Sequence, residues 1–287
     1  MIIALTPADI EQAFVGACRA ELVSLKPGNV HVYADGHRMD AAMFEASAVA
    51  AAPFIAARGT RVGERIEGAV TASVAATGRN TNLGIVLLCA PLASAEEMGE
   101  GPLRVHLADV LAGLTVEDAR GAYRAITAAR PAGLGAVEAA DVSDPPTVTL
   151  REAMLLARGH DRIANAYATD FADIFDFALP ALHTARLSAE SDARAITTLH
   201  MCLLDQFPDT HIARKFGPDA AHQVQIEAHR LRGLYLPAVD DAGFAELLAF
   251  DTDLKKRGLN PGTTADFVVA TLFADRLLAR NRRLNSN

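Results

Sequence analysis

The sequence contains no tryptophan, and only 6% of its 287 residues are aromatic. Hydrophobic residues nevertheless make up 51% of the chain, and many of them are alanine. Alanine is the best helix former, and it is too small to fill a wide space between elements. The composition therefore excludes a core built on large rings and favours helices that pack closely together.

Cysteine is also scarce, with three residues in the whole chain. Cys18, Cys89 and Cys202 lie far apart and form no paired motif. This number and spacing exclude a disulfide framework and a structural zinc site. Because each cysteine lies in an apolar helical stretch, we expect buried free thiols.

Positive charge and long apolar stretches are lacking as well. The chain has 27 basic and 35 acidic residues, with a net charge of −8 and no basic stripe, which argues against a nucleic-acid partner. Apolar runs such as 85–95 are shorter than the ~20 residues of a membrane span, and the first residues lack the basic start of a signal peptide. We expect a cytoplasmic protein with no membrane partner, and a homo-oligomer stays open.

Helical periodicity covers most of the chain, and alternating strand patterns are rare. The pattern predicts an all-α fold, a single multi-helix globular domain over 1–287, with 130–149 as the place where two lobes would divide. The stretch 83–95 is so apolar that we expect a central helix buried on all sides. Helices are predicted at 7–24, 40–57, 61–77, 83–95, 102–114, 116–129, 150–183, 192–206, 219–233, 240–257 and 261–282.

Three polar loops, at 26–29, 78–84 and 260–266, have a similar composition. The second and third place hydroxyl and amide side chains at a helix N-terminus, where free N–H groups and the helix dipole attract anions. Lys26 and Arg79 would add full positive charge. Helix capping alone is the alternative for any one loop, but three such loops favour a phosphate site. The candidate phosphate or nucleotide contacts are Lys26, Gly28, Asn29, Arg79, Asn80, Thr81, Gly84, Arg214, Asn260, Gly262 and Thr263.

Several carboxylates occur at helical spacing, and carboxylates on facing helices hold divalent metals in helical bundles. Mg²⁺ needs only one or two of them and keeps its waters for phosphate. We therefore predict Mg²⁺ as cofactor, with Asp161, Asp170 and Asp266 as candidate metal ligands. A solvated acidic surface is the alternative interpretation.

Four stretches carry a resemblance to a known family. They begin with Glu21-Leu-Val-Ser-Leu-Lys-Pro-Gly-Asn-Val30, followed by Asp40, and continue with Thr77-Gly-Arg-Asn-Thr-Asn-Leu-Gly84, Asp209-Thr-His-Ile-Ala-Arg-Lys-Phe-Gly217 and Asn260-Pro-Gly-Thr-Thr-Ala-Asp266. In this order they resemble the signature of the triphosphoribosyl-dephospho-CoA synthase family.

The resemblance implies an all-helical transferase that joins ATP to 3′-dephospho-CoA and releases adenine. Its product is the precursor of the prosthetic group of citrate or malonate lyase-type acyl carrier proteins. The loops would then hold the triphosphate and the carboxylates would hold Mg²⁺. Asp40 and Asp209, in the first and third motifs, are the candidate catalytic residues.

The second motif departs from the family pattern, since Asn82 and Leu83 stand where the family usually has His and Lys. Asn29 and His211 likewise replace Leu and Asn. The stretch 131–180 is more similar to a divergent branch from methanogens and C1-metabolising bacteria. Two alternatives therefore stay open. One is an enzyme of one-carbon carrier cofactor synthesis, of the tetrahydromethanopterin or methanofuran type, with a different acceptor. The other is a non-catalytic helical binding protein.

Overall fold

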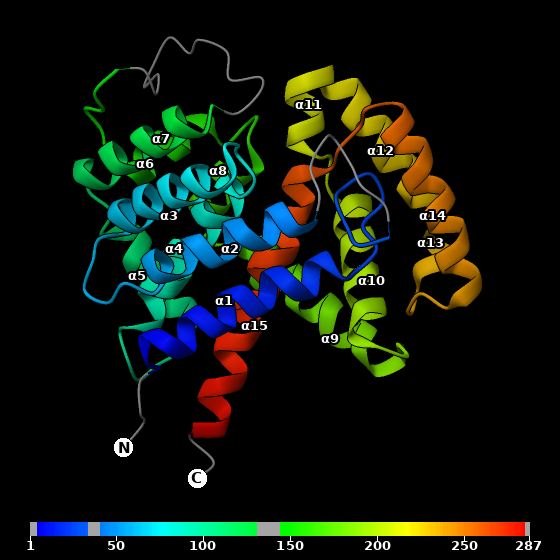
Figure 1. Cartoon of the computed structure of the whole chain (residues 1–287), viewed down its shortest axis with the longest axis horizontal. Helices are drawn as coiled ribbons and strands as arrows, with labels where there is room; N and C mark the ends of the chain where they lie inside the picture. Colours follow the sequence, from blue (N-terminus) through cyan, green and yellow to red (C-terminus); the bar gives the residue numbers. More distant parts are fainter. Residues whose placement is uncertain (1–4, 34–40, 131–143, 285–287) are drawn as a thin grey trace. The chain divides into compact units, whose positions relative to one another are not determined.

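The computed structural model describes residues 5–33, 41–130 and 144–284, with side chains up to Arg280. All regular elements in these ranges are helices, which confirms the predicted all-α class (Figure 1). They are α1 (Pro7–Leu22), α2 (Ala41–Ile55), α3 (Val62–Thr77), α4 (Leu83–Glu96), α5 (Leu103–Ala112), α6 (Val116–Ala129), α7 (Leu150–Ala157), α8 (Arg162–Ala168), the π-helix η1 (Asp173–Ala178), α9 (Leu179–Ser188), α10 (Asp192–Gln206), α11 (Thr210–Phe216), α12 (Pro218–Arg230), α13 (Arg232–Tyr235), α14 (Asp241–Lys256) and α15 (Gly262–Leu284).

Contacts divide the chain into two compact units. The first unit consists of residues 1–17, 45–172 and 272–287, and the second of residues 18–44 and 173–271. Helices α1, α2 and α15 each contribute residues to both. The prediction of one domain with a division near 130–149 stays a prediction, and residues 131–143 lie outside the described ranges.

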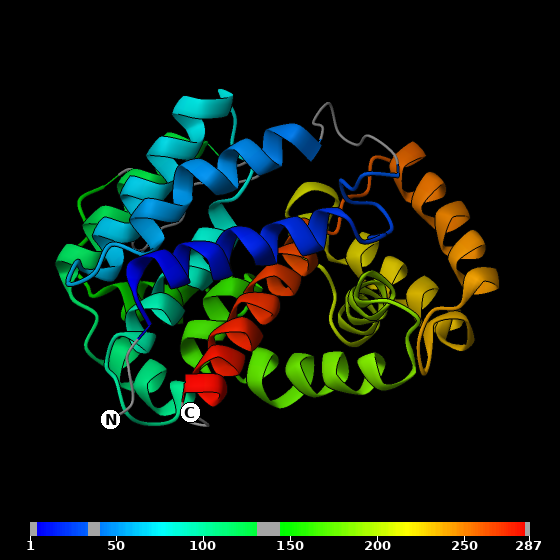
Figure 2. The ribbon, with the colours of Figure 1, turned by 60° about the horizontal axis from the view of Figure 1, so that its bottom comes forward.

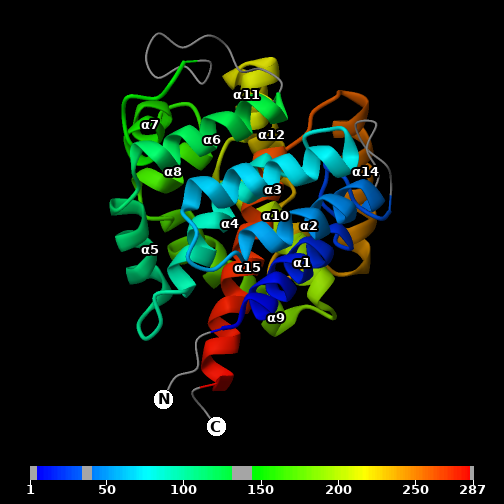
Figure 3. The ribbon, with the colours of Figure 1, turned by 60° about the vertical axis from the view of Figure 1, so that its left-hand side comes forward.

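The first unit is built around α4, which is buried along nearly its whole length, as its apolar sequence predicted. Tyr167 of α8 donates a hydrogen bond of 2.6 Å to the Leu87 carbonyl of α4. Beside α4, helices α3 and α6 lie against each other, as Figure 3 also shows. A Cβ at Gly121 would lie 2.4 Å from the Gly63 carbonyl oxygen, so glycine on both helices allows this close approach.

The second unit has its own apolar core around α10. In Figures 1 and 2, α10 runs between α9 and α14, and it packs on α9, α12 and α13. Core side chains from the loop after α1 and from several helices meet there, among them Leu25, Leu204, Ile212, Val224, Leu247 and Leu254. The loop after α1 is thus anchored through Leu25 to helices that lie far along the sequence.

Local capping signals explain why several predicted boundaries agree with the structure. Thr115 and Asp118 form the predicted capping box at the start of α6, and Thr6 and Asp9 bond reciprocally at the start of α1. Each pair satisfies backbone N–H groups that the first helical turn leaves without a partner.

Two predicted boundaries were wrong. The expected helix 150–183 is divided, because the Asp161 side chain caps a new helix, α8, and Asp170 and Phe171 adopt positive φ angles of 47° and 57°. The expected helix 219–233 ends at Arg230, and α13 follows. The short helix α11 was not predicted.

None of the three cysteines is in a disulfide bond, and Cys18 and Cys89 are buried while Cys202 is partly buried. In the described ranges, no helix has both the length and the apolar character that crossing a membrane requires.

Candidate functional site

Three of the four motifs meet inside the second unit. The Asn29 side chain donates to the Asn260 Oδ1 at 2.7 Å. Asp209 accepts from both the backbone N–H and the hydroxyl of Thr264, each at 2.8 Å. Thr210 donates to the Thr263 hydroxyl at 3.1 Å. The first, third and fourth motifs therefore form one cluster of polar side chains, which we call the loop cluster.

The turn Lys26–Asn29 fits against the fourth motif because residue 28 is glycine. The Asn29 N–H donates to the Lys26 carbonyl at 2.9 Å, and Gly28 has a φ of 83°, which L-residues rarely adopt. A Cβ on Gly28 would lie 2.8 Å from Pro261 Cδ and 3.0 Å from the Leu259 carbonyl oxygen. The two loops can approach this closely only without a side chain at this position.

Lys26 is fully buried and forms an ion pair with Glu21. Its Nζ also lies 3.3 Å from Asn29 Oδ1, to which it donates. Burial lowers the pKa of Lys26 and raises the pKa of Glu21, while the opposite charge of each partner works against both shifts. The predicted phosphate contact thus has its ammonium group enclosed by protein groups in this structure.

Asp251 of α14 also contacts the Lys26–Asn29 turn. Its Oδ1 accepts from the Gly28 N–H at 2.8 Å and lies 3.2 Å from His31 Nε2, while Oδ2 pairs with Lys255 at 3.0 Å. Burial by itself would raise the pKa of Asp251, but the hydrogen bonds and charge of its partners lower it overall. Sequence reasoning missed Asp251, and its only local signal is the i,i+4 spacing to Lys255.

The proton of His31 can be placed from its neighbours. Nδ1 accepts from the Tyr33 N–H at 3.2 Å, so a neutral ring carries its hydrogen on Nε2 and donates it to Asp251. Burial lowers the pKa of His31, which favours the neutral ring. His31 thereby joins the loop after α1 to α14.

His200 of α10 is a second buried imidazole near this cluster that sequence reasoning missed. It is fully buried, and neither ring nitrogen makes a hydrogen bond of normal geometry within the part of the chain that is described. Burial lowers its pKa to about 3, and the charge of Lys26 acts in the same direction. The ring is therefore neutral at physiological pH.

The start of α15 brings backbone N–H groups and buried hydroxyls into the loop cluster. Thr263 and Thr264 are buried, and a Cβ on Gly262 would lie 3.3 Å from the His211 ring. Asp266 is half-buried one turn further on, and its charge acts on Lys26. Arg214, half-buried on α11, acts electrostatically on Asp209, whose pKa burial raises.

The second motif lies in the first unit, at the start of α4. Arg79 is exposed, the Asn80 side chain accepts from the Leu83 N–H at 3.2 Å, and Thr81 bonds to Ser47. Gly84 lies in the first turn of α4. The contacts of Asn80 agree with the capping interpretation.

The remaining predicted carboxylates have diverse surroundings. Asp161 caps α8 through the N–H groups of Ile163 and Ala164, and Asp170 pairs with Arg151 at 2.7 Å. Asp40 lies outside the described residues. In the described ranges, no three His, Cys, Asp or Glu side chains are grouped as metal ligands.

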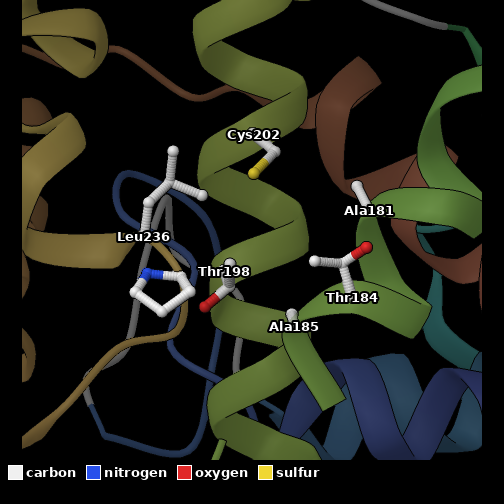
Figure 4. Close-up of a pocket in the computed structure, with 7 residues that line it drawn as sticks. Ala181, Thr184, Ala185, Thr198, Cys202 and Leu236 are labelled. Atoms are coloured by element: carbon white, nitrogen blue, oxygen red, sulfur yellow. The ribbon is translucent and has the colours of Figure 1, made fainter. Parts of the chain in front are cut away.

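Two of the cavities lined by described residues lie in the second unit. The larger, of about 480 Å³, is lined by α9, α10 and the Leu236–Pro237 segment (Figure 4). None of its lining residues is charged, so it is unsuited to phosphate. The smaller, of about 150 Å³, adjoins the loop after α1 and includes Tyr33, Arg194 and Phe244.

Comparison with known proteins gives a consistent result. Residues 7–284 match the model of the ATP:dephospho-CoA triphosphoribosyl transferase (CitG) family. A relative from Pectobacterium atrosepticum, named 2-(5″-triphosphoribosyl)-3′-dephosphocoenzyme-A synthase, is 27% identical over 92% of this chain and 87% of its own length. A crystal structure from Archaeoglobus fulgidus, described as a candidate triphosphoribosyl-dephospho-CoA synthase, has a TM-score of 0.61 at 23% identity, over 80% of this chain and 96% of the other.

Proposed function

Because the chain belongs to the ATP:dephospho-CoA triphosphoribosyl transferase family, we propose that it transfers the triphosphoribosyl group of ATP to 3′-dephospho-CoA. The observation that supports this proposal is the convergence of three motifs in the loop cluster. Asn29, Asn260 and Thr263 meet there at the start of α15, where backbone N–H groups and the helix dipole favour phosphate. Lys255, next to Asp251, supplies positive charge to the same region.

The reaction is a displacement at the anomeric carbon of the ATP ribose. A hydroxyl oxygen of dephospho-CoA forms the new C–O bond, the C–N bond to adenine breaks, and the hydroxyl proton is balanced by protonation of the adenine. The triphosphate is carried over unchanged. Catalysis then depends on holding the hydroxyl and the anomeric carbon in line, and on fixed dipoles around the developing charge.

Within this proposal, Asp209 fixes the geometry of the loop cluster. Its two oxygens accept from Ile212 at 3.0 Å and from the N–H and hydroxyl of Thr264 at 2.8 Å. A carboxylate with three such donors is held rigidly. The alignment of α11 with the start of α15 therefore depends on Asp209, and a direct catalytic role for it stays a prediction.

We further propose that Mg²⁺ enters with the triphosphate. Mg²⁺ needs only one or two protein carboxylates when phosphate and water supply its other ligands, so the site does not require a preformed cluster of ligands. Of the three predicted ligands, Asp266 fits best, because it is half-buried beside the loop cluster. Asp161 caps α8 and Asp170 pairs with Arg151, and both stay predicted ligands. When bound, Mg²⁺ would neutralise phosphate charge.

The direct test is to incubate the protein with ATP, dephospho-CoA and Mg²⁺ and to measure free adenine by chromatography. We expect adenine in proportion to the coupled product, and none when dephospho-CoA is left out. The Asn260→Ala variant should bind ATP more weakly. ATP binding without adenine release would contradict the proposed reaction. It would favour the alternative with a different acceptor in one-carbon cofactor synthesis, which the Asn82 and Leu83 departures also favour.

A further inference from the structure

The smaller cavity of the second unit has the size and lining that a site for a flat ring needs. Its volume of about 150 Å³ equals that of about five water molecules in the liquid, enough for a heteroaromatic base and too small for a nucleotide. Tyr33 comes from the loop after α1, Phe244 from α14, and Ser191 and Arg194 from the start of α10. We call it the aromatic pocket.

Aromatic groups and a guanidinium form a continuous series along this pocket. The His31 and Tyr33 ring centroids are 5.8 Å apart, and Tyr33 meets Phe244 edge-on at 5.2 Å. The Arg194 guanidinium lies 3.8 Å from the Phe244 ring centroid. Arg194 also pairs with Asp241 at 2.7 Å, so its guanidinium has two partners, the Phe244 ring and the Asp241 carboxylate.

One wall of the pocket still has an accessible ring. Tyr33 is 49% exposed, although it is held at its edge by Phe244. Ser191 accepts from the Arg194 N–H at 3.3 Å and keeps its own hydroxyl hydrogen to donate. The pocket thus offers a stacking surface and donors at its rim, which together suit a ring whose edge carries nitrogen acceptors.

The aromatic pocket and the loop cluster are connected by α14, which contributes a residue to the surroundings of each. Phe244 and Asp251 are seven residues apart on α14, so they share one face and are separated by about 10 Å along the helix. Tyr33 and His31, from one loop, make the same connection, since Tyr33 contacts Phe244 and His31 contacts Asp251. This spacing is compatible with a ring in the pocket, phosphates at the loop cluster and a ribose between them.

We propose that the aromatic pocket binds the adenine ring of ATP and holds it as the leaving group. This inference rests on the proposed function, in which the bond to adenine is the one that breaks. Base stacking on aromatic and guanidinium planes supplies the affinity. A ring held between Tyr33 and Arg194 cannot turn freely, so the anomeric carbon is presented to the hydroxyl that attacks it.

Binding can be tested separately from turnover with 2-aminopurine riboside triphosphate, whose fluorescence is quenched by stacking. We expect quenching by the wild-type protein without dephospho-CoA, and about tenfold weaker binding by Tyr33→Ala. Tyr33→Phe should retain the affinity, because it keeps the ring. Leu187→Ala, at a position on α9 that is 87% exposed, is the matched control and should behave as the wild type.

Competition experiments with parts of ATP show which part of the probe the aromatic pocket binds. Free adenine should displace the probe from the wild-type protein and should do so about tenfold less well from Tyr33→Ala, whereas tripolyphosphate should compete equally with both proteins. Equal probe affinity in wild type and Tyr33→Ala would overturn the inference even if the enzyme releases adenine. If Tyr33→Ala binds the probe more weakly but the wild-type protein releases no adenine, the result would support the pocket and contradict the proposed reaction.

Discussion

The side-chain amide of Asn29 donates a hydrogen bond of 2.7 Å to the Oδ1 of Asn260, across a separation of 231 residues in the sequence. Both side chains are buried, and Asn29 Oδ1 also accepts from the Val30 N–H at 2.8 Å. This bond is the direct link between the first and fourth motifs. Because both amides are buried, neither can readily replace a lost partner with water.

Substitution of Asn29 by Leu should therefore lower the free energy of unfolding by about 1–3 kcal/mol, because the buried Asn260 oxygen loses its donor. Urea denaturation measures the change. The Asn29→Ala and Asn260→Ala variants, alone and combined, should show a coupling of at least about 0.5 kcal/mol. Strictly additive effects would mean that the bond contributes nothing.

Alanine substitutions at two glycines of the second unit allow the cost of backbone strain to be measured apart from the cost of steric conflict. Gly28 and Gly258 have similar φ angles of 83° and 71°, but a Cβ on Gly258 meets only Phe216 Cζ, at 3.8 Å. We expect Gly258→Ala to cost about 1–2 kcal/mol from strain alone. Gly28→Ala should cost clearly more and weaken ATP binding, because its Cβ would lie 2.8 Å from Pro261. Equal losses of stability in the two variants would refute the close approach of the loops.

The buried pair Glu21–Lys26 should be sensitive to removal of one partner. Lys26→Met leaves the Glu21 carboxylate buried and uncompensated, which typically costs about 3–5 kcal/mol. The double variant Glu21→Gln/Lys26→Met removes both charges and should regain a large part of this loss. Thermal and urea unfolding measure both effects. If the double variant is less stable than Lys26→Met, the charge pair does not explain the loss.

His200 gives a pH dependence whose sign follows from its pKa. The folded-state pKa of about 3 lies below the ordinary value of 6.5, so the fold favours the neutral ring. This contribution to stability is complete above pH 6.5 and is lost as the pH falls from 6.5 towards 3, by about 1.4 kcal/mol per pH unit. Urea denaturation at pH 7, 6 and 5 should show a smaller loss for His200→Gln than for the wild type.

The control for this experiment is His222→Gln, at an exposed position on α12. It removes an exposed histidine and leaves the buried groups around His200 in place. The charged and titratable groups that act on His200 are Lys26, His31 and Asp251, and they are the same in all three proteins, so their contributions cancel in the comparison. Parallel curves for wild type and His200→Gln would show that the ring is not held neutral by the fold.

Arg79 tests whether the second motif takes part in ligand binding. Its side chain is exposed, so Arg79→Ala should change the free energy of unfolding by no more than about 0.5 kcal/mol. If Arg79 contacts the triphosphate, ATP affinity should fall about tenfold or more, since hydrogen bonds to charged groups contribute about 1.5–3 kcal/mol. Calorimetric titration of both proteins with ATP measures this affinity. An unchanged value would show that Arg79 does not contact the triphosphate.

The predictions that succeeded depended on short-range signals. The Thr115–Asp118 capping box and the apolar stretch of α4 act within one helix, and both could be read from neighbouring residues. The division of 150–183 was missed because the pattern stays apolar on both sides of Asp161, and only the fold decides that its side chain caps a new helix. Helix α11 is seven residues long, too short for periodicity to reveal.

Site residues in the loop cluster, too, could be predicted only where a short-range signal marked them. Lys26, Asn29, Asn260 and Thr263 were candidates because polar loops at helix ends are visible in sequence. Asp251 was not, because it lies within the helical pattern of α14 and its role depends on Gly28, 223 residues away in the chain. Nor could the sequence indicate His200, whose burial beside Lys26 arises only when α10 packs in the second unit.

The way the two units share the chain has a consequence for biosynthesis. Residues 272–287 belong to the first unit together with residues 1–17 and 45–172. The second unit likewise consists of two separate segments, 18–44 and 173–271. On the ribosome, the first unit thus stays incomplete until the second has been translated in full. Domains that fold one after another during synthesis escape this constraint. Phe14 of α1, whose ring packs edge-on against Phe273 with the centroids 5.9 Å apart, therefore gains this partner only after the whole second unit has been made.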